Sequence, residues 1–169
     1  MPTPADVRLL LDVMLGKLAT YLRMCGYDAA YALDRGVEDD AVLCSAADRE
    51  GRTLLTRDVE LATNASDGLL LESHDVRGQL LELSRRGYAL SLDAPSRCSR
   101  CNGRLDRLGP EEATPPFAPD PDGTPVWRCR DCGQPFWQGS HWEDVADTLE
   151  GIRRAAEGGR STALDGSEP

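Results

Sequence analysis

The sequence VRLLLDVMLGKLATYLRMCG, residues 7–26, determines how the rest of the chain can fold. It begins with a nearly continuous apolar run, which is typical of a buried β-strand, and continues from Leu15 with apolar residues at helical spacing. Asp12 lies where the predicted strand ends and the predicted helix begins. Because ligands usually bind at the carboxyl ends of the strands in an open α/β sheet, Asp12 is the first candidate for a functional residue.

Strand and helix patterns continue to alternate as far as residue 94. Apolar runs predict strands over residues 27–33, 52–56 and 67–72, and helical spacing predicts helices over residues 41–50, 59–65 and 75–87. This alternation predicts an α/β domain over residues 6–94, with a parallel sheet of about four strands that is flanked by helices and joined by right-handed crossovers.

The composition limits the classes of protein to which the chain can belong. It has 169 residues, 40% of them hydrophobic, but no apolar run long enough to cross a membrane. The first residues, MPTPADVR, lack the pattern of a signal peptide, so we expect a cytoplasmic protein. The net charge is −10, Asp outnumbers Glu by 18 to 11, and Lys17 is the only lysine. Because molar salt screens self-repulsion, this surface suggests the hypothesis of a halophilic origin.

Four of the six cysteines form two C-x2-C pairs, Cys98 with Cys101 and Cys129 with Cys132. Two such pairs predict one structural Zn²⁺ in a closed tetrahedral site, whereas two disulfides would be unusual in the cytoplasm. Gly103 and Gly133 follow the pairs and are expected to adopt positive φ. The surrounding sequence predicts a zinc ribbon over residues 95–140, a helix over 141–157 and a disordered tail over 158–169.

Basic residues near these patterns are candidates for contact with phosphate groups. Arginines flank both cysteine pairs, where they would either bind RNA phosphates or only offset the charge of four thiolates. An acidic chain needs such a local basic concentration if it is to bind a nucleic acid. The residues considered for phosphate or RNA contact are Lys17, Arg57, Arg97 and Arg100.

Two more acids share the position of Asp12 at the carboxyl end of a strand. Asp40 opens the helix after the second predicted strand, and Asp58 follows the third. Grouped carboxylates repel one another unless a hard cation such as Mg²⁺ or Mn²⁺ binds them, and this chemistry suits metal-dependent phosphodiester hydrolysis. The alternative is that Asp40 and Asp58 only cap helices. Glu60 is a possible fourth ligand, and Asp39 competes with Asp40 for its role.

These segments together resemble a known family. They are LLLDVMLGKLATYLRMCGYD from residue 9, the D-x-x-L element of residues 40–43, LLTRDVEL from residue 54, SRCSRCNGRL from residue 96 and WRCRDCGQPFWQGSHWE from residue 127. The chain resembles the C-terminal RNase domain family named after the Mut-seven exonuclease over roughly residues 7–145.

The resemblance implies a PIN-like nuclease domain, a zinc ribbon and RNA hydrolysis that depends on Mg²⁺ or Mn²⁺. The acids of that fold carry over to Asp12, Asp40 and Asp58. PIN-like domains usually have a fourth acid, for which Glu60 and Asp67 are the available residues.

The predicted function is therefore a ribonuclease with RNA as its partner. A non-catalytic module that binds RNA or protein through the ribbon is the alternative. A phospho-receiver domain is disfavoured because Asp12 is a single acid and Lys17 does not follow the last strand. The sequence carries no signal about a homo-oligomer.

Overall fold

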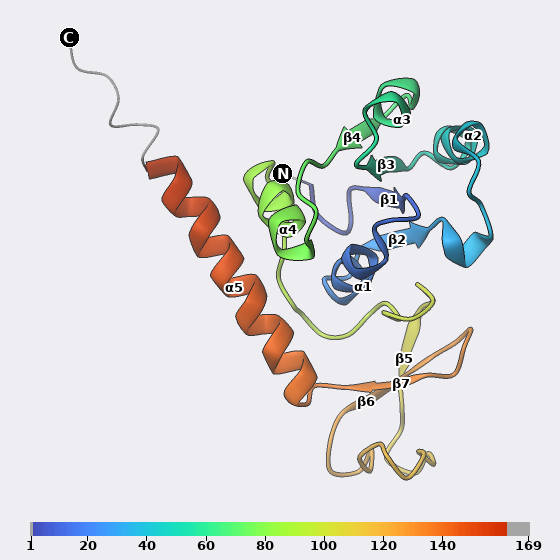
Figure 1. Ribbon diagram of the computed structural model, residues 1–169. Helices are drawn as coiled ribbons and strands as arrows, with labels where there is room; N and C mark the ends of the chain where they lie inside the picture. Colours follow the sequence, from blue (N-terminus) through green and yellow to red (C-terminus); the bar gives the residue numbers. More distant parts are fainter. Residues whose placement is uncertain (1, 162–169) are drawn as a thin grey trace.

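A parallel sheet of four strands forms the centre of the larger part of the molecule (Figure 1). The computed structural model describes residues 2–161. The strands are β1 (Arg8–Leu11), β2 (Asp28–Tyr31), β3 (Thr53–Thr56) and β4 (Gly68–Leu70), in the order β2-β1-β3-β4. All three pairings in this sheet are parallel, so the predicted sheet is confirmed.

Helices cover both faces of this sheet because the buried residues of β1 alternate between two hydrophobic clusters. Leu9 and Leu11 belong to the larger cluster, and Leu10 belongs to the smaller one. The larger cluster includes residues of α1 (Gly16–Met24) and α4 (Val76–Arg85). The smaller cluster includes residues of α2 (Asp40–Glu50) and α3 (Val59–Asn64). A 3-10 turn, Leu33–Arg35, follows β2.

The strand order reverses between β1 and β3 in the parallel sheet. The chain forms β2 on one side of β1 and then returns to form β3 on the other side. Ligands in doubly wound sheets bind at such a reversal of strand order. Asp12 and Asp58 follow the two strands that flank this reversal, β1 and β3.

A second, smaller sheet carries the two cysteine pairs. Its strands are β5 (Leu105–Arg107), β6 (Val126–Cys129) and β7 (Pro135–Trp137), which are antiparallel. The four cysteines lie close together beside this sheet, as a zinc ribbon requires.

The first cysteine turn is held against the outer edge of β2. The side-chain oxygen of Asn102 accepts a hydrogen bond of 3.0 Å from the Ala29 N–H, and its Nδ2 donates one of 2.8 Å to Asp28. The buried Arg23 of α1 donates through Nη1 to the carbonyl groups of Ser99 and Arg100. These contacts cover an edge that has no strand beside it.

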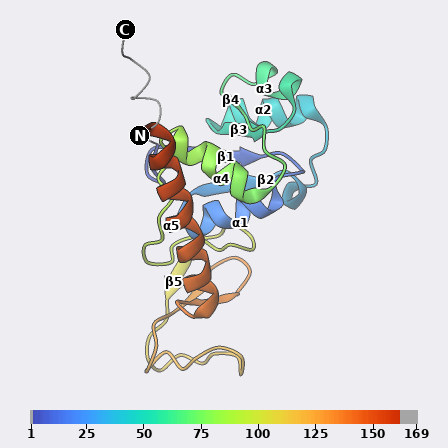
Figure 2. The ribbon, with the colours of Figure 1, turned by 60° about the vertical axis from the view of Figure 1, so that its left-hand side comes forward.

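The helix α5 (Ser140–Ser161) begins at the small sheet and runs beside α4 in both views (Figures 1 and 2). Its residues Val145, Leu149 and Ile152 join the larger hydrophobic cluster. It continues through residues 158–161, which the sequence assigned to a disordered tail, because a helix already packed on a partner extends at little cost. The rest of that expected tail, residues 162–169, lies outside the described residues. None of the described helices is long and apolar enough to cross a membrane.

Candidate active site and zinc site

Asp12 is buried at the carboxyl end of β1 and has a fixed side chain. It is 5% exposed, which is rare for a carboxylate, and both of its oxygens accept hydrogen bonds. Oδ1 accepts from the Val13 N–H at 2.7 Å, and Oδ2 accepts from the Thr56 hydroxyl at 2.7 Å. The Thr56 hydroxyl also accepts from the Asp58 N–H at 3.0 Å. One threonine at the end of β3 therefore connects the two acids that flank the reversal of strand order.

Asp39 and Asp40 have different structural roles at the start of α2. Asp39 is the N-cap residue, and its carboxylate accepts a 3.0 Å hydrogen bond from the Val42 N–H. Asp40 lies in the first turn, is exposed, and makes no side-chain hydrogen bond or ion pair with any described residue. The capping alternative thus applies to Asp39, and the carboxylate of Asp40 is available for another partner.

Asp58 is also an N-cap residue, for α3. Its Oδ1 accepts a 3.0 Å hydrogen bond from the Leu61 N–H. The cap occupies only one of its two oxygens, because a carboxylate has about four acceptor positions. Capping and metal binding by Asp58 are therefore compatible.

The two candidates for a fourth acid lie at opposite edges of the sheet. Glu60 is exposed in the first turn of α3, on the same edge as Asp58. Asp67 precedes β4 and accepts a 2.6 Å hydrogen bond from Thr53, the first residue of β3. That position is the amino edge, far along the strands from Asp12, so Glu60 is the better placed of the two. We call the edge that carries Asp12, Asp40, Asp58 and Glu60 the carboxylate edge.

The spacing of these acids differs from that of a closed metal cage. Among the described residues, the four cysteines are the only group of three or more potential ligands whose atoms all lie within 4.8 Å of one another. Mg²⁺ usually keeps several waters and binds only one or two carboxylates together with substrate phosphates. The acids of the carboxylate edge suit such a partly hydrated ion in their chemistry, although they do not enclose one.

Two basic side chains border the carboxylate edge. Nη2 of Arg57 lies 2.6 Å from Nδ1 and 2.9 Å from Nε2 of His74, and the buried Nε of Arg57 has no hydrogen-bond partner in residues 2–159. Lys17, in the first turn of α1, is exposed and forms no ion pair within the same range. His74 is isolated in its segment, so no sequence pattern singles it out, and its contact with Arg57 depends on the fold.

The arginines of the ribbon are largely engaged by the protein itself. Arg97 donates to the carbonyl group of Asn102 at 3.1 Å and lies 3.8 Å from the carboxylate of Asp28. Arg100 is exposed and donates to the side-chain oxygen of Gln134 at 3.3 Å. Arg97 is thus part of the joint between the ribbon and β2, whereas Arg100 remains accessible to solvent.

The four cysteine sulfurs have the spacing of a tetrahedral zinc site. Cys98 Sγ lies 3.7 Å from Cys132 Sγ, and Cys101 Sγ lies 3.4 Å from Cys129 Sγ. Four sulfurs at about 2.3 Å from one ion would be roughly 3.8 Å apart. Burial raises the pKa values of Cys98 and Cys101, whereas hydrogen bonds from the N–H groups of Cys132 and Asp131 lower the pKa of Cys129 to about 7 despite its burial. These donors favour the thiolate, which is the form that binds metal.

The two turns of the zinc site use different residues for their left-handed conformation. Gly133 has φ of 77°, as expected, but in the first turn the positive φ of 71° is at Asn102. The expectation for Gly103 is therefore wrong. Gly103 is required for another reason, because a Cβ at this position would lie 2.7 Å from Cys129 Sγ and 2.6 Å from the Asp131 carboxylate.

Comparison with known families agrees with this arrangement. A family model described as the Mut7-C RNAse domain matches residues 7–149. The chain belongs to the Mut7-C RNAse domain family. The matched range includes the three acids of the prediction, the four cysteines and all three strands of the small sheet. No curated protein and no solved structure matched this member of the Mut7-C family.

Proposed function

We propose that the protein is a metal-dependent ribonuclease and that the carboxylate edge hydrolyses phosphodiester bonds of RNA. The observation that carries this proposal is the buried Asp12, which Thr56 connects to Asp58 at the reversal of strand order. Membership of the Mut7-C RNAse domain family supports a nuclease-like function related to RNA.

The acids of the carboxylate edge would hold the cation. Asp12 is fixed by two hydrogen bonds and would present the same oxygens to every ion, and Asp40 has no competing partner among the described residues. A bound Mg²⁺ or Mn²⁺ would lower the pKa of an attacking water and stabilise the leaving oxygen. Glu60 is available to contact a water of that ion.

Neighbouring basic groups would orient the substrate. Arg57 lies beside His74 at this edge, and its positive charge would attract a phosphate group of the substrate. Lys17 projects from the helix that follows Asp12 and adds a second positive charge. The zinc ion of the ribbon would be structural, because four thiolates leave no position for substrate.

A cleavage assay on single-stranded RNA tests this function. Wild type is compared with Asp12→Asn and Asp58→Asn, with added Mg²⁺ or Mn²⁺ and in both dilute and molar KCl. We expect each variant to lose at least about 100-fold in cleavage rate, because a metal ligand contributes several kcal/mol to the transition state. Asp67→Asn is the matched control, since Asp67 lies at the opposite edge. Undiminished cleavage by both variants would show that these acids are not catalytic.

A non-catalytic module that binds RNA or protein is the second candidate. The absence of a closed carboxylate cage among the described residues favours it. Its signature would be an RNA affinity that Asp12→Asn leaves intact, combined with no cleavage by wild type in Mn²⁺.

A further inference from the structure

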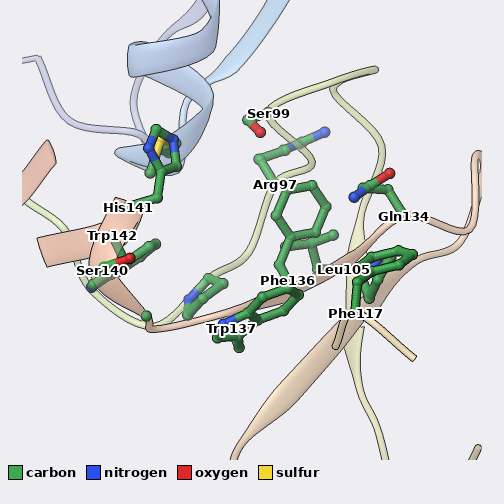
Figure 3. Close-up of a pocket in the computed structure, with 14 residues that line it drawn as sticks. Arg97, Ser99, Leu105, Phe117, Gln134, Phe136, Trp137, Ser140, His141 and Trp142 are labelled. Carbon is green, nitrogen blue, oxygen red and sulfur yellow. The ribbon is translucent and has the colours of Figure 1, made fainter. Parts of the chain in front are cut away.

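A cavity of about 320 Å³ lies where the ribbon meets the start of α5. Figure 3 shows His141 and Trp142 of α5 on one side, Phe117 and Gln134 on the other, and Phe136 and Trp137 of β7 between them. None of its lining residues belongs to the carboxylate edge. We call it the aromatic pocket. Its volume falls within the range of about 300–1,000 Å³ that is usual for small-molecule sites.

Aromatic side chains are concentrated in this pocket to an unusual degree. The chain has three tryptophans and two phenylalanines, and four of these five residues line the pocket. They do not form a closed hydrophobic core, because Phe117 is 66% exposed and Phe136, Trp137 and Trp142 are only partly buried. Accessible ring faces on several sides of one cavity suit a flat ligand that can stack.

The indole ring of Trp137 lies against the turn between β7 and α5. A Cβ at Gly139 would lie 2.8 Å from Nε1 of Trp137 and 3.0 Å from its Cδ1. Gly139 therefore leaves room for the indole ring beside the turn from β7 into α5. A side chain at this position would displace the ring and change the shape of this wall of the pocket.

The polar groups of the pocket are available for recognition. The indole N–H groups of Trp137 and Trp142 and the ring of His141 have no hydrogen-bond partner in residues 2–159. Gln134 accepts from Arg100 through its oxygen, which leaves its amide N–H groups free to donate. Although the chain has a net charge of −10, no Asp or Glu lines the pocket, and Arg97 does.

We propose that the aromatic pocket binds an unpaired nucleobase of single-stranded RNA. The base stacks on the accessible aromatic rings, its polar edge meets Gln134 and the free ring nitrogens, and Arg100 contacts the adjoining phosphate. Stacking platforms with a neighbouring positive charge are the usual means of binding single strands. The choice of RNA as the ligand rests on the proposed function, whereas the preference for a base rests on the pocket itself.

Binding of short oligonucleotides to the zinc-loaded full-length protein tests this inference. Without added Mg²⁺ or Mn²⁺, fluorescence anisotropy compares a labelled single-stranded RNA with the same backbone carrying abasic residues. Quenching of tryptophan emission reports occupancy of the pocket. We expect a 5- to 100-fold weaker affinity, on the order of one lost stacked base, for the abasic RNA and for Trp137→Ala.

Two further variants separate recognition from folding. Phe117→Ala removes an exposed ring, so it should weaken RNA binding without changing the melting temperature. Trp137→Phe should retain most of the affinity because it keeps a ring for stacking. Leu33→Ala, at an exposed apolar residue outside the pocket, is the control and should bind as wild type does. Single-stranded DNA of the same sequence tests whether the sugar contributes.

Several results would overturn the inference. One is equal affinity for the intact and abasic RNA, and another is wild-type affinity in both Trp137→Ala and Phe117→Ala. Self-association that Phe117→Ala abolishes would assign the pocket to a second copy of the chain instead. Base-dependent binding without any cleavage would leave the pocket assignment standing and reject only the nuclease. Cleavage at the wild-type rate in every pocket variant would support the nuclease and reject the pocket as an RNA site.

Discussion

The hydroxyl group of Thr56 donates a 2.7 Å hydrogen bond to the carboxylate of Asp12 while it accepts one from the Asp58 N–H. Thr56 is fully buried, so no water competes for these bonds. The side chain therefore fixes the orientation of Asp12 relative to the start of α3. Mutation of a residue that orients a metal ligand commonly lowers metal affinity or activity by about 10- to 100-fold.

Thr56→Val should lower RNA cleavage about 10- to 100-fold, because it keeps the shape of the side chain and removes the hydroxyl. Thr56→Ser should retain most of the activity. The matched control is Thr53→Val at the other end of the same strand, which loses a similar bond to Asp67. Initial cleavage rates, with melting temperatures measured in parallel, check this prediction. A Thr53→Val variant as inactive as Thr56→Val would indicate a general loss of packing.

The adjacent acids at the start of α2 should separate stability from activity. Asp39→Ala removes the N-cap and should cost about 1 kcal/mol in the free energy of unfolding, with little change in cleavage. Asp40→Ala should lower cleavage and leave stability nearly unchanged, because its carboxylate has no partner among the described residues. Urea denaturation and cleavage assays on both variants provide the measurements. The opposite assignment of effects would make Asp39 the functional acid.

Freshly purified protein should contain one zinc ion per chain. Cys101→Ser or a chelator should lower the melting temperature by roughly 5 to 10 °C, because an ion that binds only the folded state stabilises it. Cys44→Ser is the control, since Cys44 lies on α2 away from the four grouped sulfurs. Metal analysis and thermal melts check the prediction. Less than one zinc per chain, or equal melting temperatures for both variants, would contradict it.

The interactions of ionised Glu50 with two arginines should stabilise the folded protein at neutral pH and be lost in acid. Hydrogen bonds from Arg35, and in addition from Arg52, lower the pKa of Glu50 from 4.5 to about 2. The unfolded chain therefore binds the proton more tightly, so the stabilisation is complete above about pH 4.5 and is lost as the pH falls towards 2. Its loss should cost roughly 1 kcal/mol, because the group is partly solvated.

The comparison of Glu50→Gln with wild type measures this contribution. The free energy of unfolding should differ between the two proteins at pH 7 and converge near pH 2. Acid also releases zinc, but it does so in both proteins, so the difference between the two curves isolates Glu50. Glu60→Gln is the control, since Glu60 is an exposed glutamate without an ion pair among the described residues. Parallel curves for Glu50→Gln and wild type would refute the assignment.

Local patterns predicted the sheet and the shared edge of the acids. The apolar run before Asp12 and the turn residues between segments act over a few neighbours, so a single sequence is sufficient to read them. Parallel topology then requires the ends of β1 and β3 to meet at one edge, which brings Asp12 and Asp58 near each other. The spacing of the four cysteines likewise predicts a tetrahedral metal site without knowledge of the rest of the fold.

Other features depend on the backbone conformation or on contacts between distant segments, which local sequence patterns do not determine. Asp39 and Asp40 both meet the chemical requirement of an N-cap, and only the backbone conformation selects Asp39. The positive φ at Asn102 is tied to its bonds with β2, which are long-range contacts. The aromatic pocket combines residues between Met24 and Trp142, so no spacing within one segment could have revealed it.

The bonds between Asn102 and β2 give the zinc ribbon a protective role. An open sheet edge presents unpaired N–H and C=O groups to other chains and is a common starting point for aggregation. Here the side-chain oxygen of Asn102 accepts a hydrogen bond from the Ala29 N–H. The turn that carries Asn102 also carries two of the four grouped cysteines. We therefore expect the protein to aggregate more readily through the edge of β2 when zinc is scarce.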